Sequence, residues 1–228
     1  MIRAICFDFD GTLVDSEVIH TNIWLEFLKH FNIKYTEEEF TDLYTGLPTP
    51  FVSEKLVDQY KLPMSPQEFT HEKVSFARKK LNQRAFPLQP HANELLQFAK
   101  QHYQISLVTG SGLNVISPTL KQNNWFELFE YIITADDVTN NKPYPDSYML
   151  ACKKMNVLPN ESLAIEDSFT GYTAATNAGL KTILLPNTAS VTQKKITPLK
   201  MFNNLKELEE WLKKQPLILH KRELNENL

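Results

Sequence analysis

The sequence predicts an α/β protein in which a doubly wound parallel sheet, with helices on both faces, is interrupted by an all-α insertion. Three observations support this fold class. A short apolar run lies at the N-terminus, only helical patterns follow over residues 16–86, and strand and helix patterns alternate from residue 87 onward. Such alternation indicates βαβ units and therefore a parallel sheet. We accordingly divide the chain into a core, residues 1–15 and 87–228, and an insertion, residues 16–86.

The elements up to residue 86 follow from local signals. Residues 2–7 are rich in strand-forming side chains, and Gly11 ends the segment that follows them, so they predict a buried strand. Helix starts in the insertion are signalled by Asp15 or Ser16 as N-cap, by Thr36 with Glu39, and by Ser65 with Glu68. The expected helices are residues 16–31, a short helix after Thr36, 51–60 and 66–84.

Beyond Pro87 the patterns alternate. The expected strands are residues 105–109, 131–135, 163–166 and 181–185. The expected helices are residues 91–101, a stretch ending near 123, 145–155, 168–178 and 204–214. Pro118 falls inside the second of these helices, where it should either kink the helix or mark its true start. The tail from residue 215 carries no clear pattern.

The composition of the chain narrows the range of functions that the protein can have. The chain has 228 residues, a net charge of −3 and scattered basic residues, which argues against nucleic acid as a main partner. No apolar stretch is long enough for a membrane span, and acidic residues interrupt the N-terminal run, unlike a signal peptide. Cys6 and Cys152 form no C-x-x-C pair, so we expect two buried small hydrophobes in a reducing compartment. A cytoplasmic location is therefore expected.

Two acidic residues directly follow the first strand, in the segment Asp8-Phe9-Asp10-Gly11-Thr12. Because strand side chains alternate, Asp8 and Asp10 should leave the strand end on the same side. Two carboxylates at such a short distance repel each other and shift each other's pKa. The pair therefore predicts a cation site, a division of acid and base work, or both.

Polar residues follow the other predicted strands as well. They are Thr109, Gly110 and Ser111 after the second strand, Lys142 beyond the third, and Glu166 and Asp167 at the fourth. Taken singly, Thr109 could simply end a strand and Lys142 could be a solvated loop residue. Ligands of open parallel sheets, however, bind outside the carboxyl ends of the strands.

Together these residues would place up to four carboxylates and one ammonium group around one crevice. Without a cation, that arrangement would be costly through desolvation and repulsion. Oxygen ligands with no His or Cys beside them favour Mg²⁺ over zinc, and Mg²⁺ held by few carboxylates usually takes phosphate oxygens as well. The residues themselves therefore predict a Mg²⁺-dependent phosphate site.

The four motifs, in this order, resemble those of the haloacid dehalogenase (HAD) superfamily. They are Asp8-x-Asp10-Gly11-Thr12, the strand-ending Thr109, Lys142 in a Lys-Pro-x-Pro-Asp setting, and Glu166-Asp167-Ser168. The helical insertion looks like the α-helical cap of the β-phosphoglucomutase and phosphoglycolate phosphatase-like group. The resemblance implies a Rossmann-like core with an inserted all-α cap, and a small phosphorylated metabolite as the substrate. We expect the protein to be a monomer.

The resemblance also implies roles for the residues. Asp8 would be the nucleophile that becomes an aspartyl-phosphate, and Asp10 would act as acid and then as base, which requires a raised pKa. Mg²⁺ would be held by Asp8, the carbonyl of Asp10 and Asp167, with Glu166 as a direct or indirect ligand. The transferring phosphoryl group would be bound by Thr109, Gly110, Ser111 and Lys142.

Other interpretations fit the motifs less well. A calcium loop needs its glycine sixth, whereas Gly11 comes fourth. Val115 occupies the third glycine position of a dinucleotide turn, and a nucleophile elbow would need glycine at position 109. A catalytically inactive homologue is disfavoured because every carboxylate and the lysine are present.

Within the family, the two activities that are hardest to tell apart from the sequence are phosphatase and sugar-phosphate mutase. The β-phosphoglucomutase-type cap holds a second phosphate with an arginine after its glycine-containing loop, but residues 46–51 contain no basic side chain. Lys73, Arg78 and Lys79 could compensate, although a solvated helix face explains them more simply. His20 could touch the leaving group or could only pack, and we leave it out of the catalytic set. The sequence therefore favours a Mg²⁺-dependent phosphatase, with the mutase as the alternative.

Overall fold

The computed structural model describes residues 1–44, 47–81, 84–185 and 197–215. The chain forms two compact units. The sheet unit comprises Met1–Val14, Leu88–Gly112 and Asn124–Leu228, and the helical unit comprises Asp15–Pro87 and Leu113–Asn123. The helical unit thus includes a segment, Leu113–Asn123, that the sequence-based division places in the core.

The sheet unit contains a six-stranded sheet, in the order β3-β2-β1-β4-β5-β6, in which every neighbouring pair is parallel. The strands are β1 Ala4–Phe7, β2 Gln104–Val108, β3 Tyr131–Ile133, β4 Ser162–Glu166, β5 Lys181–Leu184 and β6 Lys200–Met201. The central strand β1 is fully buried, and Phe7 at its end is in register with Leu107 of β2 and Ile165 of β4. The carboxyl ends of the three central strands therefore lie together.

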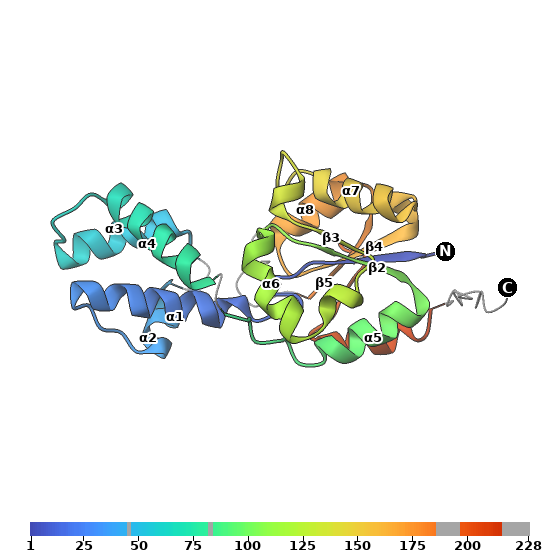
Figure 1. The fold of residues 1–228 in the computed structure, drawn as a ribbon, viewed down its shortest axis with the longest axis horizontal. Helices are drawn as coiled ribbons and strands as arrows, with labels where there is room; N and C mark the ends of the chain where they lie inside the picture. Colours follow the sequence, from blue (N-terminus) through green and yellow to red (C-terminus); the bar gives the residue numbers. More distant parts are fainter. Residues whose placement is uncertain (45–46, 82–83, 186–196, 216–228) are drawn as a thin grey trace. The chain divides into compact units, whose positions relative to one another are not determined.

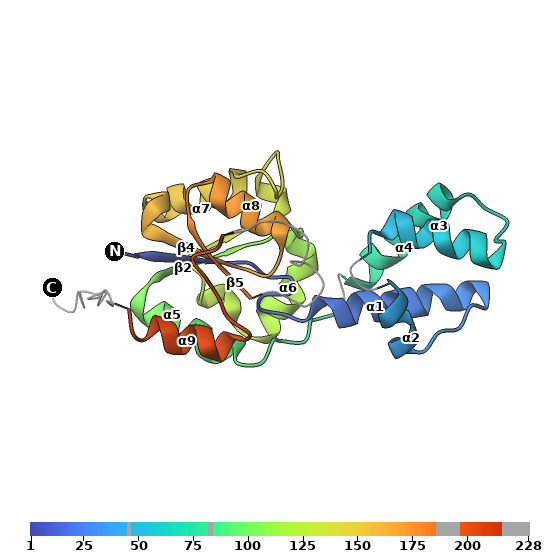
Figure 2. The ribbon, with the colours of Figure 1, turned by 180° about the vertical axis from the view of Figure 1, so that it is seen from behind.

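Helices cover both faces of this sheet (Figures 1 and 2). Helices α7 (Asp146–Met155) and α8 (Phe169–Asn177) pack on one face, and α5 (Ala92–His102) and α9 (Leu205–Leu212) pack on the other. Cys6 of β1 and Cys152 of α7 are both buried in the hydrophobic core on the α7–α8 face, as predicted. The predicted doubly wound α/β fold is confirmed.

The helical unit is held by an aromatic core. Its helices are α1 Ser16–Leu28, α2 Glu37–Tyr44, α3 Thr49–Tyr60, α4 Pro66–Leu81 and α6 Leu113–Gln122. Trp24 and Phe27 of α1 pack on Phe69 of α4, with ring centroids 6.3 and 5.1 Å apart. The Thr119 hydroxyl of α6 accepts the backbone N–H of Phe86 at 2.8 Å, which ties α6 to the end of the insertion.

The predicted helix starts form as expected. Asp15 caps α1 by accepting the N–H of Val18 at 3.4 Å. Before α2, the Glu39 carboxylate accepts the N–H of Thr36 at 2.7 Å, and the Thr36 hydroxyl accepts the N–H of Glu39 at 3.1 Å. These reciprocal bonds satisfy donors that the first turn of a helix cannot pair internally.

Some elements differ from the prediction. Strand β3 ends at Ile133 because Thr134 caps a short 3₁₀ turn, Ala135–Asp137. Pro118 lies inside α6, so it does not mark the start of that helix. The two-residue strand β6 was not predicted. Three predicted features lie partly or wholly outside the described residues. They are the end of the helix predicted over 66–84, the glycine of the 46–51 loop and the tail beyond residue 215.

Lys73 corrects one expectation. It is 5% exposed rather than part of a solvated helix face, and its ammonium lies 4.6 Å from the centroid of the Trp24 ring. Burial lowers the pKa of Lys73 to about 8. The cation–π contact explains how the helical unit accommodates this side chain.

Among the described residues, no helix has both the length and the apolar character that a membrane span needs.

Candidate active site

The loop after β1 presents Asp8 at the carboxyl edge of the sheet. Asp8 is buried, and its N–H donates to the carbonyl of Ile165 at 2.9 Å, which continues the pairing of β1 with β4. Gly11 follows with a φ of +80°, and its N–H donates to the carbonyl of Val14 at 2.9 Å. A side chain at Gly11 would place its Cβ 2.0 Å from Asp167 Oδ2. Glycine is thus required both by the turn and by the carboxylate beside it.

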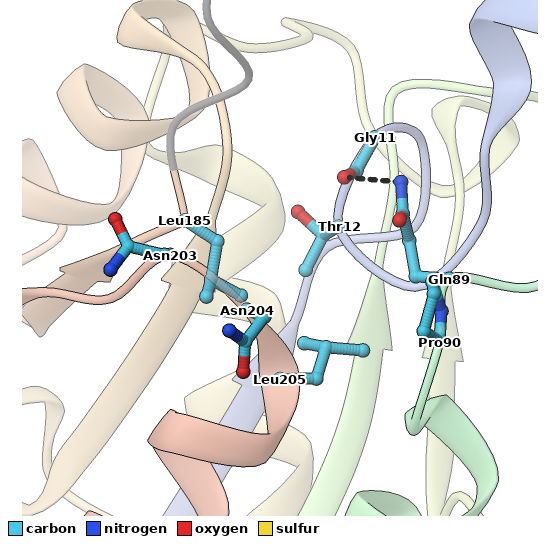
Figure 3. A pocket seen from close by; sticks show the side chains of 8 residues that line it. All are labelled: Gly11, Thr12, Gln89, Pro90, Leu185, Asn203, Asn204 and Leu205. Carbon is cyan, nitrogen blue, oxygen red and sulfur yellow. Dashed lines mark hydrogen bonds between the residues drawn. The ribbon is translucent and has the colours of Figure 1, made fainter.

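The other side of this loop faces a separate small pocket, shown in Figure 3. Gln89 Nε2 donates to the carbonyl of Gly11 at 3.4 Å. Thr12 is 1% exposed, and its hydroxyl has no hydrogen-bond partner among the residues that the structure describes. The pocket is lined by Gly11, Thr12, Gln89, Pro90, Leu185, Asn203, Asn204 and Leu205.

Lys142 connects the first and fourth strand ends. Its Nζ donates to Asp8 Oδ1 at 2.6 Å, to Glu166 Oε1 at 2.7 Å and to the carbonyl of Val108 at 2.9 Å. Burial alone would lower the pKa of Lys142, but the two carboxylates outweigh it and raise the pKa well above the ordinary value. Lys142 is therefore a fixed positive charge at Asp8, not a solvated loop residue.

Glu166 is completely buried at the end of β4. Besides Lys142, it accepts a hydrogen bond from the Tyr148 hydroxyl of α7 at 2.5 Å. Its carboxyl group lies against Gly171 of α8, where a Cβ would come within 2.0 Å of Cδ and of both carboxylate oxygens. Desolvation and the nearby charge of Asp8 raise the pKa of Glu166 to about 7.

Three acidic side chains converge at this edge. Asp8, Glu166 and Asp167 each offer an oxygen, and these oxygens lie within 4.8 Å of one another. Burial first, and then the charges of Asp8 and Glu166, raise the pKa of Asp167 to about 9. The set consists of carboxylate oxygens with the Lys142 ammonium as a counter-charge, so it suits a hard divalent cation such as Mg²⁺.

Asp10 has different partners. Its Oδ2 accepts hydrogen bonds from the hydroxyls of Ser111 at 2.8 Å and Thr109 at 3.3 Å. Burial and then the charge of Asp8 raise the pKa of Asp10, in the direction that the sequence analysis requires for an acid–base group. The hydroxyl bonds oppose this shift because they stabilise the charged form.

The structure brings the predicted residues of all four strand ends together. A pocket of about 380 Å³ is lined by Asp8, Asp10, Gly110, Asn141, Lys142, Asp167, Ser168, Thr170 and Gly171. The hydroxyl of Ser111, predicted to bind phosphate, donates a hydrogen bond to Asp10. His20 lies on α1 of the helical unit and is exposed.

Sequence reasoning missed several residues of the site. Tyr148 and Gly171 contact Glu166 from helices α7 and α8, and Asn141 lines the pocket beside Lys142. A signal was available for Asn141, which precedes Lys142 in the motif, and for Gly171, a glycine in the first turn of a predicted helix. Nothing local marks Tyr148.

Comparison with known proteins agrees with this geometry. Residues 5–185 match the family described as "Haloacid dehalogenase-like hydrolase". The chain is 35% identical over 191 residues to "Putative phosphatase YhcW" of Bacillus subtilis, covering 82% of this chain and 84% of that protein. It is 27% identical to "Fructose-1-phosphate phosphatase YqaB" of Escherichia coli, covering 79% of this chain and 94% of that protein.

Among solved structures, a HAD family hydrolase from Deinococcus radiodurans R1, with bound phosphate and sodium, has the same fold. Its TM-score is 0.73 at 23% identity, covering 92% of this chain and 95% of that one. The chain belongs to the family of haloacid dehalogenase-like hydrolases. The predicted resemblance is confirmed, and so is the prediction of an enzyme of the phosphoric monoester hydrolase class, with which the family and the names of both relatives agree.

Proposed function

We propose that the protein is a Mg²⁺-dependent phosphatase that hydrolyses a small phosphate monoester, such as a sugar phosphate, through an aspartyl-phosphate on Asp8. The observation that carries the proposal is the position of Asp8, which contacts Lys142 and shares one pocket with Asp10 and Asp167. The names of the two relatives support a phosphatase rather than a mutase, and that of the E. coli relative supports a sugar phosphate.

In the first half-reaction, a carboxylate oxygen of Asp8 attacks phosphorus while the bond from phosphorus to the leaving oxygen breaks. Asp10 gives its proton to that oxygen, so the alcohol leaves neutral. In the second half-reaction, Asp10 takes a proton from water, and the resulting hydroxide attacks phosphorus while the bond from phosphorus to the Asp8 oxygen breaks. Inorganic phosphate leaves, and both side chains return to their starting protonation states.

The transition state of phosphoryl transfer is loose, and its negative charge lies on the phosphoryl oxygens. The active site must therefore mainly stabilise that negative charge. Lys142 brings a permanent positive charge to Asp8, and burial strengthens its effect. The Thr109 hydroxyl and the Gly110 amide would donate hydrogen bonds to the same oxygens. Ser111 would either join them or keep holding Asp10.

The carboxylates of Asp8 and Asp167 and the carbonyl of Asp10 would hold Mg²⁺, with Glu166 as a direct or indirect ligand. The cation would supply charge neutralisation for the phosphoryl group and for the acidic cluster. The fit rests on the convergence of three carboxylates within 4.8 Å beside Lys142.

We further propose that the insertion of residues 16–86 acts as a cap that excludes bulk water, with hinges near Val14–Asp15 and residues 86–88. The change of unit between Val14 and Asp15 and between Pro87 and Leu88 supports these hinge positions. We expect a cytoplasmic monomer whose partner is a small phosphorylated metabolite, not nucleic acid or a membrane. Gel filtration with light scattering tests the monomer.

The nucleophile is tested with Asp8→Asn, assayed by phosphate release from p-nitrophenyl phosphate and from a panel of sugar phosphates. We expect the variant to lose turnover while its circular dichroism stays native. Asp42→Asn, the same change at an exposed residue of α2, is the matched control and should keep full activity. Turnover by Asp8→Asn at the wild-type rate would refute the assignment.

A further inference from the structure

A buried tyrosine takes part in the acidic site without belonging to any of the four motifs. Tyr148 of α7 is fully buried, and its hydroxyl lies 2.5 Å from Glu166 Oε1. A tyrosine hydroxyl carries its proton at neutral pH, so it donates to the carboxylate. With Glu166 ionised, this is a charge-assisted hydrogen bond, which is stronger than a bond between neutral groups.

The two oxygens of Glu166 have unequal partners. Oε1 accepts from Tyr148 and also from Lys142 Nζ at 2.7 Å. Among the residues that the structure describes, Oε2 has one longer contact, from the Ser168 hydroxyl at 3.3 Å. Two strong donors therefore occupy Oε1, and Oε2 keeps most of its capacity to accept.

Packing against α8 restricts the carboxyl group on one side. Gly171 leaves no side chain between α8 and Glu166, so the carboxyl group lies directly on the helix backbone. Lys142 Nζ also lies 5.1 Å from the centroid of the Tyr148 ring. Tyr148 therefore contacts both the Glu166 carboxyl group and the Lys142 ammonium group, and it helps to position both of them.

We propose that Tyr148 is a positioning residue of the metal site: together with Lys142 it occupies Oε1 of Glu166 and turns Oε2 toward the cation. This inference rests on the proposed Mg²⁺ site. Without the hydroxyl, the carboxyl group would be held at Oε1 by Lys142 alone and could rotate away from the geometry that the cation requires. Outer partners of metal ligands commonly change metal affinity by about 10- to 100-fold.

The test is the dissociation constant of Mg²⁺ for the full-length protein, measured by isothermal titration calorimetry without substrate. Tyr148→Phe removes the hydroxyl and keeps the ring, and we expect Mg²⁺ binding to weaken about 10-fold. Tyr103→Phe is the matched control. It makes the same change at a buried tyrosine that precedes β2, at the amino edge of the sheet and away from the site, and should leave Mg²⁺ binding unchanged.

A double-mutant cycle asks whether Tyr148 acts through Glu166. In a Glu166→Gln background there is no carboxylate to orient, so adding Tyr148→Phe should change the Mg²⁺ dissociation constant less than twofold. A purely structural tyrosine would instead lower thermal stability in both backgrounds and leave metal binding alone.

The outcomes separate this inference from the proposed function. If the wild-type protein binds no Mg²⁺, the proposed metal site fails, and the inference fails with it. If the wild type binds Mg²⁺ and Tyr148→Phe binds it equally well, only the inference is overturned. It is also overturned if the effect persists in Glu166→Gln, or if Tyr148→Phe loses its native circular dichroism while Tyr103→Phe keeps it.

Discussion

The contact between Gly171 and Glu166 allows a stability prediction whose sign opposes intrinsic helix propensity. Gly171 lies in the first turn of α8, where alanine would ordinarily stabilise the helix by up to about 1 kcal/mol. Here the new Cβ would lie 2.0 Å from the Glu166 carboxyl group, whereas real Cβ contacts are essentially never shorter than 3.0 Å. Glu166 would therefore have to move by roughly 1 Å, judged by the usual limits of packing.

That movement has two costs. Overpacking a close-packed interior costs about 1–3 kcal/mol. The hydrogen bonds of Glu166 to Lys142 and Tyr148, now 2.7 and 2.5 Å, would lengthen toward the limit of a useful bond. Weakening a bond to a charged group costs up to about 1.5–3 kcal/mol. After the helix gain is subtracted, we expect Gly171→Ala to lose roughly 2–4 kcal/mol of unfolding free energy.

The assay is thermal and urea unfolding of the metal-free protein, followed by circular dichroism. The expected loss corresponds to a Tm lower by about 5–15 °C for a chain of this size. Gly110→Ala is the matched control, because the nearest described atom to its new Cβ is Asn141 Oδ1 at 3.9 Å, which is ordinary contact. It should change stability by less than about 1 kcal/mol. A Gly171→Ala protein as stable as wild type would refute the reasoning.

Three further predictions concern the metal, the product and pH. Chelation with EDTA should abolish activity, and full activity in excess EDTA would exclude the metal site. Mg²⁺ at 100 times its Kd should restore activity and add about 2.7 kcal/mol to the unfolding free energy. With β-glucose 1-phosphate and its bisphosphate, the protein should release inorganic phosphate, and efficient formation of glucose 6-phosphate would favour the mutase. Glu209 contacts His91 and Lys213, and these contacts outweigh burial and lower its pKa. The contribution of ionised Glu209 to stability is therefore fully present above the ordinary Glu pKa and is lost as the pH falls through the lowered pKa. Glu209→Gln should cost about 1–3 kcal/mol of unfolding free energy at pH 7 and progressively less in acid. A difference in stability between the variant and the wild type that does not change with pH in chemical denaturation would contradict this.

The placement of the site followed from the sequence because it depends on a topological rule. In a parallel sheet, residues that follow successive strands meet at one edge, so Asp8, Thr109 and Glu166 could be placed together without coordinates. Helix caps such as Thr36 with Glu39 were equally accessible, because the bonds join residues three apart.

What sequence reasoning missed depends on contacts between distant segments. Tyr148 has no local pattern that distinguishes it from any other core aromatic residue, and its partner Glu166 lies 18 positions away. Lys73 was misjudged because a lysine among charged neighbours normally indicates a solvated face, and only the tertiary contact with Trp24 buries it. The end of β3 shifted because Thr134 pairs with Asp137 instead of continuing the strand.

The central claim is that Asp8 carries the phosphoryl group during turnover. A crystal structure with Mg²⁺ and fluoroberyllate, a mimic of the covalent phosphoryl group, tests it most directly. We predict beryllium bonded to a carboxylate oxygen of Asp8, with its fluorines near Thr109 and Lys142. Fluoroberyllate on another residue, or an Asp8 carboxylate left bare beside saturating fluoroberyllate, would contradict the account.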